Sequence, residues 1–202
     1  MITILDYDMG NISSIQNMIN YLGYDSVLSS RKEDLIKAEK IILPGVGAFN
    51  EGMYQLKKLG LIEILNERVL IDRIPILGIC LGIQLFTRKS EEGNEKGLGW
   101  IDSETKKFCN MGALKIPHMG WNSVFKNKDN KLIEGLDEKA RFYFVHSYHV
   151  VCNDNEDVLL TTCYGKKFVS AIQKDNIYGT QFHPEKSHKF GMTILKNFCE
   201  LN

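Results

Sequence analysis

A cysteine flanked by two glycines stands where a predicted strand passes into a predicted helix. Residues 74–84 read Ile-Pro-Ile-Leu-Gly-Ile-Cys-Leu-Gly-Ile-Gln, which places Cys80 between Gly78 and Gly82. This G-x-C-x-G spacing is typical of a nucleophile elbow, the sharp strand-to-helix turn that exposes a nucleophilic side chain. A helix N-terminus favours negative charge, so the turn favours the thiolate, which is the reactive form of cysteine. The sequence therefore predicts that Cys80 is a nucleophile.

The groups that would activate such a nucleophile stand near the C-terminus. His183 and Glu185 belong to a Gln-Phe-His-Pro-Glu segment, and residues 177–182 predict a strand that would bring His183 to the active edge of a sheet. An imidazole can take the proton of a thiol, and a carboxylate two residues away can fix the tautomer of the ring. Taken alone, the cysteine could be a small buried hydrophobic residue. Together, the three residues predict a Cys-His-Glu triad.

A glycine-rich turn follows another predicted strand, at residues 44–47 with the sequence Pro-Gly-Val-Gly. A phosphate cradle is one interpretation, but the lysine and the Ser/Thr of a P-loop are missing from this turn. Glycines also let backbone N–H groups approach a developing negative oxygen, which is the task of an oxyanion hole. We therefore expect the turn to supply one donor and the backbone N–H of Leu81 to supply the other.

Alternating strands and helices in the first half must position these groups. Apolar runs and helical spacing predict strands over 2–5, 25–29, 40–43 and 76–79, and helices over 11–22, 33–38 and 59–69. This order implies βαβ units and a parallel sheet, in which the working groups gather beyond the carboxyl ends of the strands. Cys80 and the glycine-rich turn both follow such ends.

The second half predicts short strands with close turns, and therefore antiparallel additions to the sheet. The expected strands are 106–108, 121–125, 143–146, 158–162, 168–174 and 177–181, and a final helix is expected over 190–201. We see no repeat, low-complexity tract or linker in the sequence. The prediction is one α/β domain over 1–202, with a flavodoxin-like open, mostly parallel sheet, helices on both faces and added antiparallel strands in the C-terminal half.

Composition limits the classes of partner and site. Lys plus Arg and Asp plus Glu both number 25, and a net charge of zero argues against nucleic acid as the main partner. The five cysteines include no C-x-x-C pair and are odd in number, so we expect no disulfide framework, no metal site and a reducing compartment. Without a basic leader or an apolar run of about 18 residues, a cytoplasmic location and no membrane contact are expected.

With these residues in view, the chain resembles the class I, or triad-type, glutamine amidotransferases over nearly its whole length. The elbow and the His-Pro-Glu element are specific to this superfamily. Other segments resemble more closely the glutaminase subunits of imidazole glycerol phosphate synthases, and the most specific are Pro-His-Met-Gly-Trp-Asn and Tyr-Phe-Val-His-Ser-Tyr. The segments that resemble these proteins are 6–11, 43–47, 78–84, 117–122, 143–148 and 181–187.

The resemblance implies a glutaminase that needs no cofactor. Cys80 would attack the carboxamide carbon of glutamine, His183 would carry the proton to the leaving ammonia, and Glu185 would orient the imidazole. Water would then release glutamate from a glutamyl thioester. Gly47 and Leu81 would supply the oxyanion donors after a rearrangement of the glycine-rich turn. The residues that would hold the amino-acid end of glutamine are Gln84, Ser147 and Tyr148.

The resemblance also implies a partner, a (β/α)8-barrel synthase subunit that forms a heterodimer with this chain. In the family this subunit receives the ammonia and makes imidazole glycerol phosphate in histidine biosynthesis. Asn11, Trp121 and Tyr143 match residues at the subunit interface near the ammonia exit, although Trp121 could instead be a core aromatic. Because ammonia protonates in bulk water, a direct path between the subunits is expected.

Three alternatives stay open beside this hypothesis. The first is a paralogous subunit that supplies ammonia for amidination of a surface-polysaccharide or glycan sugar. The others are a cysteine peptidase of related topology and an inactive regulatory subunit, although the latter would lack a triad member and all three are present. The positions that depart from the common family pattern bear on the partner, and they are Asp8, Trp100 and His149.

Overall fold

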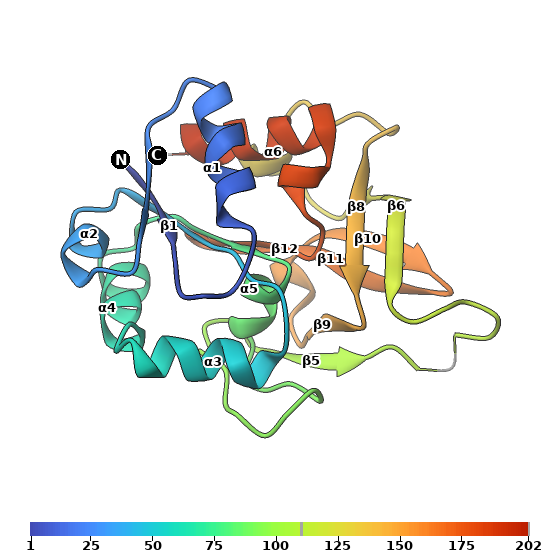
Figure 1. The fold of residues 1–202 in the computed structure, drawn as a ribbon. Helices are drawn as coiled ribbons and strands as arrows, with labels where there is room; N and C mark the ends of the chain where they lie inside the picture. The colour runs from blue at the N-terminus through green and yellow to red at the C-terminus, as the bar shows by residue number, and fades with distance from the viewer. Residues whose placement is uncertain (110, 202) are drawn as a thin grey trace.

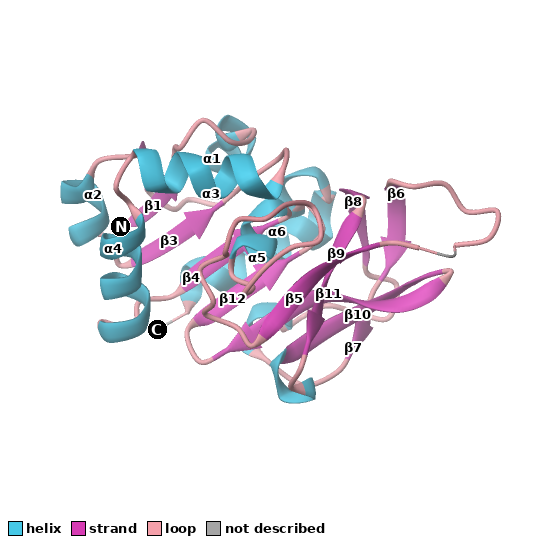
Figure 2. Cartoon of the chain, turned by 90° about the horizontal axis from the view of Figure 1, so that it is seen from below, coloured by secondary structure: helices cyan, strands magenta, loops and turns pink. Residues whose placement is uncertain are grey.

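The computed structural model describes residues 1–109 and 111–201. An eight-stranded sheet in the order β2-β1-β3-β4-β12-β11-β10-β7 runs through its centre (Figure 1, Figure 2). The first five strands in this order are parallel, and the order 2-1-3-4-5 is that of flavodoxin-like sheets. The last three are antiparallel additions. The predicted fold class is therefore confirmed.

Two further pairs of strands form ribbons beside this sheet, where β5 pairs with β9 and β6 pairs with β8 (Figure 2). The strands are β1 Ile2–Leu5, β2 Ser26–Ser29, β3 Lys40–Leu43, β4 Ile76–Ile79, β5 Ser103–Lys107, β6 His118–Ser123, β7 Phe125–Lys126, β8 Arg141–His146, β9 Tyr148–Cys152, β10 Val158–Tyr164, β11 Lys166–Lys174 and β12 Ile177–Thr180.

Helices cover both faces of the sheet, which leaves two buried hydrophobic clusters, one on each side (Figure 1). Apolar side chains of α1 and α6 belong to one cluster, and those of α2, α3, α4 and α5 belong to the other. No helix within the described residues is long and apolar enough to cross a membrane. The helices are α1 Ile12–Tyr21, α2 Lys32–Ile36, α3 Phe49–Lys58, α4 Ile62–Asn66, η1 Glu67–Ile71, α5 Leu81–Leu85, η2 Lys131–Ile133, η3 Asn155–Asp157, η4 Pro184–Lys186 and α6 His188–Glu200.

Local sequence explains these elements. All four residues of β1 and of β4 are buried, as expected for parallel strands covered on both faces. Ile15 and Ile19, four residues apart, form the buried stripe of α1. The chain turns after this helix at Gly23, whose φ of +86° is readily available only to glycine.

The predicted helix over 59–69 is wrong at its N-terminal end. Residues 59–61 form a turn, because Gly60 adopts a φ of +63° that ends the preceding helix. That preceding helix, α3, was not predicted, although its buried residues Phe49, Met53 and Leu56 have helical spacing. The remainder of the predicted segment is helical, as α4 followed by the π-helical turn η1.

The second half differs from the prediction in three places. The strand predicted over 106–108 begins at Ser103 and ends at Lys107. The strand predicted over 121–125 begins three residues earlier, at His118, and stops at Ser123 before β7 begins. Strand β9 was not predicted, because Ser147 separates it from β8 by a single residue and the apolar pattern runs through both. On either side of Ser147, β8 and β9 therefore pair with different strands: β8 with β6, and β9 with β5.

Candidate active site

The predicted nucleophile elbow is centred on Cys80, the residue between β4 and α5. Its φ of 55° and ψ of −102° are rare for a residue with a side chain and mark the strain of a sharp turn. A Cβ on Gly82 would lie 1.9 Å from the carbonyl oxygen of Leu43, and one on Gly78 would lie 2.7 Å from the backbone of Gly82. Both flanking glycines are therefore required by close backbone contacts.

Parallel pairing of β4 with β12 brings the two halves of the site together. Ile79 lies opposite Thr180, and the backbone N–H of Cys80 donates to the carbonyl oxygen of Thr180 at 2.8 Å. The chain then continues past β12 to His183, whose backbone N–H donates to the carbonyl oxygen of Tyr143 at 2.9 Å. The structure thus places the predicted nucleophile and the predicted base at the same edge of the sheet.

His183 and Glu185 form a buried pair. The Nδ1–H group of His183 donates to Oε1 of Glu185 at 2.7 Å, and their side chains are 2% and 3% exposed. The short helix η4, which begins at Pro184, turns the carboxylate back toward the ring. This contact fixes the tautomer that leaves Nε2 free to exchange a proton with another group.

The electrostatics of the pair involve Cys80 as well. Burial favours the neutral imidazole, but the Cys80 sulfur and the Glu185 carboxylate outweigh this effect and raise the pKa of His183 above its ordinary value. Within the described residues, Nε2 has no hydrogen bond of good geometry. The Cys80 sulfur thus influences the ring although the two side chains form no hydrogen bond of good geometry, and such bonds are often long or poorly aligned in sites without bound substrate.

The glycine-rich turn touches the elbow through its backbone. The N–H of Leu81 donates to the carbonyl oxygen of Gly45 at 3.2 Å. Gly47 has a φ of +110°, and the hydroxyl of the buried Tyr7 donates to the carbonyl oxygen of Pro44 at 2.6 Å. The predicted donor groups thus lie beside Cys80, but one of them already has an acceptor.

A cavity of about 370 Å³ opens directly over Cys80. It brings together the sequence-predicted residues of both the oxyanion hole and the glutamine site. Its lining residues are Val46, Gly47, Cys80, Leu81, Gln84, Glu92, Pro117, Val145, His146, Ser147 and Tyr148. A cavity of this size suits a small polar ligand such as a free amino acid.

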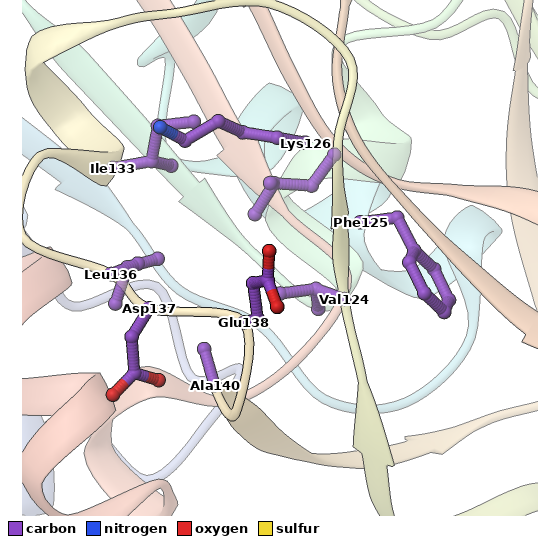
Figure 3. A pocket seen from close by; sticks show the side chains of 9 residues that line it. Val124, Phe125, Lys126, Ile133, Leu136, Asp137, Glu138 and Ala140 are labelled. Atoms are coloured by element: carbon purple, nitrogen blue, oxygen red, sulfur yellow. The ribbon is translucent and has the colours of Figure 1, made fainter.

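A larger cavity, of about 710 Å³, lies elsewhere, between β7, β10 and the segment after η2 (Figure 3). Its walls are mostly apolar, with Val124, Leu136 and Ala140 among them, and the charged side chains of Lys126, Asp137 and Glu138 also line it (Figure 3). It contains none of the sequence-predicted site residues. The residues that could carry out a reaction therefore favour the smaller cavity over Cys80 as the candidate active site.

Two of the three residues predicted at a partner interface, Trp121 and Tyr143, lie opposite each other in the ribbon β6–β8, and the third, Asn11, immediately precedes α1. Trp121 is 40% exposed, so it is not a core aromatic, and its ring stacks on His188 with centroids 5.3 Å apart. The rings of Trp121 and Tyr143 lie 6.2 Å apart in an edge-to-face arrangement. Asn11 is exposed and lines a small cavity that also reaches His183 and Glu185. Exposed Met119 extends this surface.

The three departures from the common pattern have different structural settings. Asp8 is exposed with a φ of 64°, a left-handed conformation that glycine adopts more readily. Trp100 is buried and donates from its indole N–H to Oδ1 of Asn66 at 2.7 Å. His149 is buried against Phe108, and neither ring nitrogen has a hydrogen-bond partner among the described residues.

Sequence reasoning assigned no role to three buried polar residues around the site, namely Tyr7, His146 and Gln181. His146 lies next to Ser147 and donates from Nδ1 to the carbonyl oxygen of Tyr148 at 2.7 Å. Gln181 contacts Cys80 and Gln84. The sequence signal for these residues was their position within the segments that resemble the family, 6–11, 143–148 and 181–187. The sequence around a polar residue in an apolar run does not otherwise indicate which groups it contacts.

Comparisons with a family model and with individual proteins agree on one family. The family described as glutamine amidotransferase class-I matches residues 3–201. One relative, the imidazole glycerol phosphate synthase subunit HisH 2 of Methanococcus maripaludis, is 56% identical over 200 residues, which are 99% of each chain. Another of the same name, from Pseudomonas aeruginosa, is 51% identical over 100% of each chain. Subunit HisH 1 of Campylobacter jejuni is 48% identical, also over 100% of each chain.

Solved structures agree in fold. A crystal structure of a glutamine amidotransferase has a TM-score of 0.73 at 18% identity, and covers 98% of this chain and 97% of its own. A structure of PurLQS from Thermotoga maritima has a TM-score of 0.73 at 16% identity, with coverage of 98% and 96%. At these identities the likeness concerns the fold alone.

Proposed function

This chain belongs to the class-I glutamine amidotransferase family, and we propose that it is the subunit that releases ammonia from glutamine for a separate synthase subunit. One observation carries the proposal: Cys80, at a strained turn over a small cavity, shares one sheet edge with the buried His183–Glu185 pair. The relatives at 48–56% identity over nearly the whole chain are named as subunits of imidazole glycerol phosphate synthase. We therefore assign the ammonia to that synthase and to histidine biosynthesis.

The proposed reaction begins with Cys80 as a thiolate and His183 as an imidazolium. The sulfur attacks the carboxamide carbon of glutamine and forms a tetrahedral intermediate with a negative oxygen. His183 then gives its Nε2 proton to the leaving nitrogen, and ammonia departs as the thioester forms. Water, activated by the neutral imidazole, releases glutamate and restores the thiolate. Glu185 holds Nδ1 throughout and stabilises the charged ring.

Substrate binding is proposed for the cavity over Cys80. Gln84, Ser147 and Tyr148 line its wall, and they would hold the amino and carboxylate groups of glutamine while the side-chain amide reaches the sulfur. The negative oxygen of the intermediate would receive the N–H groups of Leu81 and Gly47. Since the Leu81 N–H donates to Gly45 here, the turn over 44–47 must move before that donor is available.

The proposed partner is a (β/α)8-barrel synthase subunit that covers the exposed aromatic surface around Trp121. Asn11, which immediately precedes α1, shares a small cavity with His183 and Glu185, and we propose that the ammonia leaves the triad there toward the partner. Tyr143 supports the same route, because its carbonyl oxygen holds the backbone of His183. A closed path keeps ammonia out of water, where protonation would destroy its nucleophilicity.

A second candidate keeps the glutaminase and changes the acceptor of the ammonia to a surface-polysaccharide or glycan sugar. The names of the three relatives described above carry the numbers 1 or 2, which would fit more than one copy of this subunit in an organism. Where two copies exist, only one is needed for a single synthase. This chain departs from the common pattern at Asp8, which has a left-handed backbone, and at the buried Trp100 and His149.

The test of the leading proposal uses the chain together with a barrel synthase subunit from the same genome. Cys80→Ser should abolish synthesis from glutamine while synthesis from added ammonium salts survives. Cys163→Ser is the matched control, because Cys163 is a free, exposed cysteine, and it should behave as the unchanged protein. Normal glutamine use by Cys80→Ser would refute the assigned nucleophile. Glutamate release stimulated only by a sugar-modifying barrel subunit would select the second candidate.

A further inference from the structure

Gln181 is a completely buried polar residue directly after β12, two residues before His183. Its backbone N–H donates to the carbonyl oxygen of Ser170 at 2.9 Å. Strand β11 carries an extra residue there, because Leu160 pairs with Ala171 and Thr161 pairs with Val169, which leaves Ser170 unpaired in the ladder with β10. Such bulges are frequent beside active sites, where they redirect a side chain.

The side chain of Gln181 bridges two residues of the proposed site. Its Oε1 accepts a hydrogen bond from Nε2 of Gln84 at 3.1 Å, and its own Nε2 lies 3.8 Å from the sulfur of Cys80 with donor geometry. Nε2 of Gln84 also donates to the carbonyl oxygen of Tyr148 at 3.1 Å. A buried amide must satisfy its polar groups, so these contacts decide how Gln181 is held.

The Tyr148 carbonyl fixes the orientation of both amides. A backbone carbonyl can only accept, so the Gln84 atom that faces it must be the nitrogen, and Gln181 must then present its oxygen to that nitrogen. The remaining Gln181 atom, which faces the Cys80 sulfur, is therefore the nitrogen. A flip of either amide would place two donors or two acceptors against each other. The Gln181 group that faces the Cys80 sulfur must therefore be an N–H donor.

The same orientation defines what Gln84 offers to the cavity. Both hydrogens of its Nε2 are used, on Tyr148 and on Gln181, so the group left for a ligand is the acceptor Oε1. An acceptor at this place suits the ammonium of an amino acid and disfavours a ligand that lacks one.

The Nε2–H group of Gln181 has a separate effect on the sulfur of Cys80. A buried N–H group stabilises a thiolate more than a thiol, since a charged acceptor forms the stronger hydrogen bond.

We propose that Gln181 is a further catalytic residue of this enzyme, donating to the Cys80 sulfur, and that it also positions Gln84 so that an acceptor faces the ammonium group of the substrate. The proposal rests on the proposed glutaminase function. It makes one residue responsible for two separable effects. The donor to the sulfur governs the reactivity of the nucleophile, and the acceptor toward Gln84 governs recognition of the amino acid.

Two substitutions separate these effects. Gln181→Glu keeps an oxygen toward Gln84 but replaces the donor at the sulfur by a second oxygen. It should lower the rate of Cys80 alkylation by iodoacetamide at pH 7 and the kcat for glutamine by about 10- to 100-fold, with KM nearly unchanged. Gln181→Met removes both contacts, so KM should rise about tenfold in addition. Gln173→Met is the matched control, because that side chain bonds to Asp175 away from the cavity.

Alkylation is followed at Cys80 by mass spectrometry in the isolated chain from pH 6 to pH 9, and kcat and KM are measured in the complex with the barrel subunit. Alkylation and kinetics equal to those of the unchanged protein in either folded Gln181 variant would overturn the inference. Because alkylation needs no glutamine, this result is distinct from a failure of the unchanged complex to use glutamine, which would instead refute the proposed function. Circular dichroism and urea midpoints identify a variant that does not fold, and the other variant then decides.

Discussion

The backbone N–H of Leu81 donates a hydrogen bond to the carbonyl oxygen of Gly45 over 3.2 Å. Leu81 follows the nucleophile directly, so its N–H points to where a negative oxygen would develop during attack on an amide. The carbonyl of Gly45 occupies that donor in this state. Gly47, two residues farther on, has a φ of +110° and can change conformation at little cost. In the proposed mechanism, a local rearrangement of this turn would free the Leu81 N–H for the oxyanion hole.

We expect the isolated chain to hydrolyse glutamine slowly and the partner subunit to accelerate it. Removing one oxyanion donor typically costs about 10²- to 10³-fold in kcat, so acceleration of that order is expected when the turn rearranges. Glutamate release measured with and without the barrel subunit checks this. An isolated chain that is as fast as the complex would show that the Leu81–Gly45 hydrogen bond does not limit turnover.

The carboxylate of Glu185 is expected to be essential for rate but not for folding. Glu185→Gln keeps the shape of the side chain but presents an amide that favours the wrong tautomer of His183, so kcat should fall by about 10²- to 10⁴-fold. Steady-state kinetics in the complex measure the effect. Glu138→Gln, at the larger cavity of Figure 3, is the control and should leave kcat unchanged. A loss of less than threefold for Glu185→Gln would argue against the triad.

His149 is expected to limit stability in acid. Burial, with a further contribution from Lys166, lowers its pKa to about 4, so the folded protein binds fewer protons than the unfolded chain between about pH 6.5 and pH 4. Stability contributed by this residue is therefore lost as the pH falls through that range, by up to about 1.4 kcal/mol per pH unit. His149→Phe should remove this loss.

The same substitution should also raise stability at pH 7. His149 packs against Phe108 and Phe168, and its ring nitrogens are buried without hydrogen-bond partners among the described residues. Replacing an unsatisfied polar group by an apolar ring of similar shape should gain about 1 kcal/mol. Urea unfolding at pH 7 and pH 5 measures both effects. A variant whose unfolding free energy falls as steeply with pH as that of the unchanged protein would contradict this account.

Trp121 is expected to be a main contact with the partner. It is large, 40% exposed and held by stacking on His188, as suits an aromatic anchor at an interface. Trp121→Ala should raise the Kd of the complex by about 30-fold or more. Phe125→Ala is the matched control, because Phe125 is also an exposed aromatic but belongs to the edge strand β7. Titration calorimetry with the barrel subunit should show no change for Phe125→Ala; equal effects of both substitutions would place the interface elsewhere.

Several elements were accessible to sequence reasoning because their signals are local. The strand before Cys80 is a short apolar run, and the paired glycines mark a turn whose backbone contacts exclude a Cβ. Helix α3 was not predicted although its apolar spacing is regular, because it begins just after the glycine-rich turn with Ala48 at its N-cap, which gives no side-chain signal for a helix start. Strand β9 was missed because only one residue, Ser147, separates it from β8.

Other features depend on contacts between distant residues, and sequence patterns do not carry them. The hydrogen bond from Leu81 to Gly45 depends on one peptide orientation in a flexible turn. The donor from Gln181 to sulfur depends on the Tyr148 carbonyl, which fixes two amides in series. The absence of partners for the His149 ring nitrogens within the described residues depends on the packing of three aromatic rings. Such arrangements become visible only in three dimensions.

Strand β12 lies between β4 and β11, although it is the last of the strands to be synthesised. During translation the central sheet cannot form completely until β12 has left the ribosome, because β12 pairs with both β4 and β11. His183 and Glu185 follow β12 in the chain, so these two side chains can pack near Cys80 only after this strand has been synthesised. The topology thus makes assembly of the proposed triad depend on the strand of the central sheet that is synthesised last among the described strands.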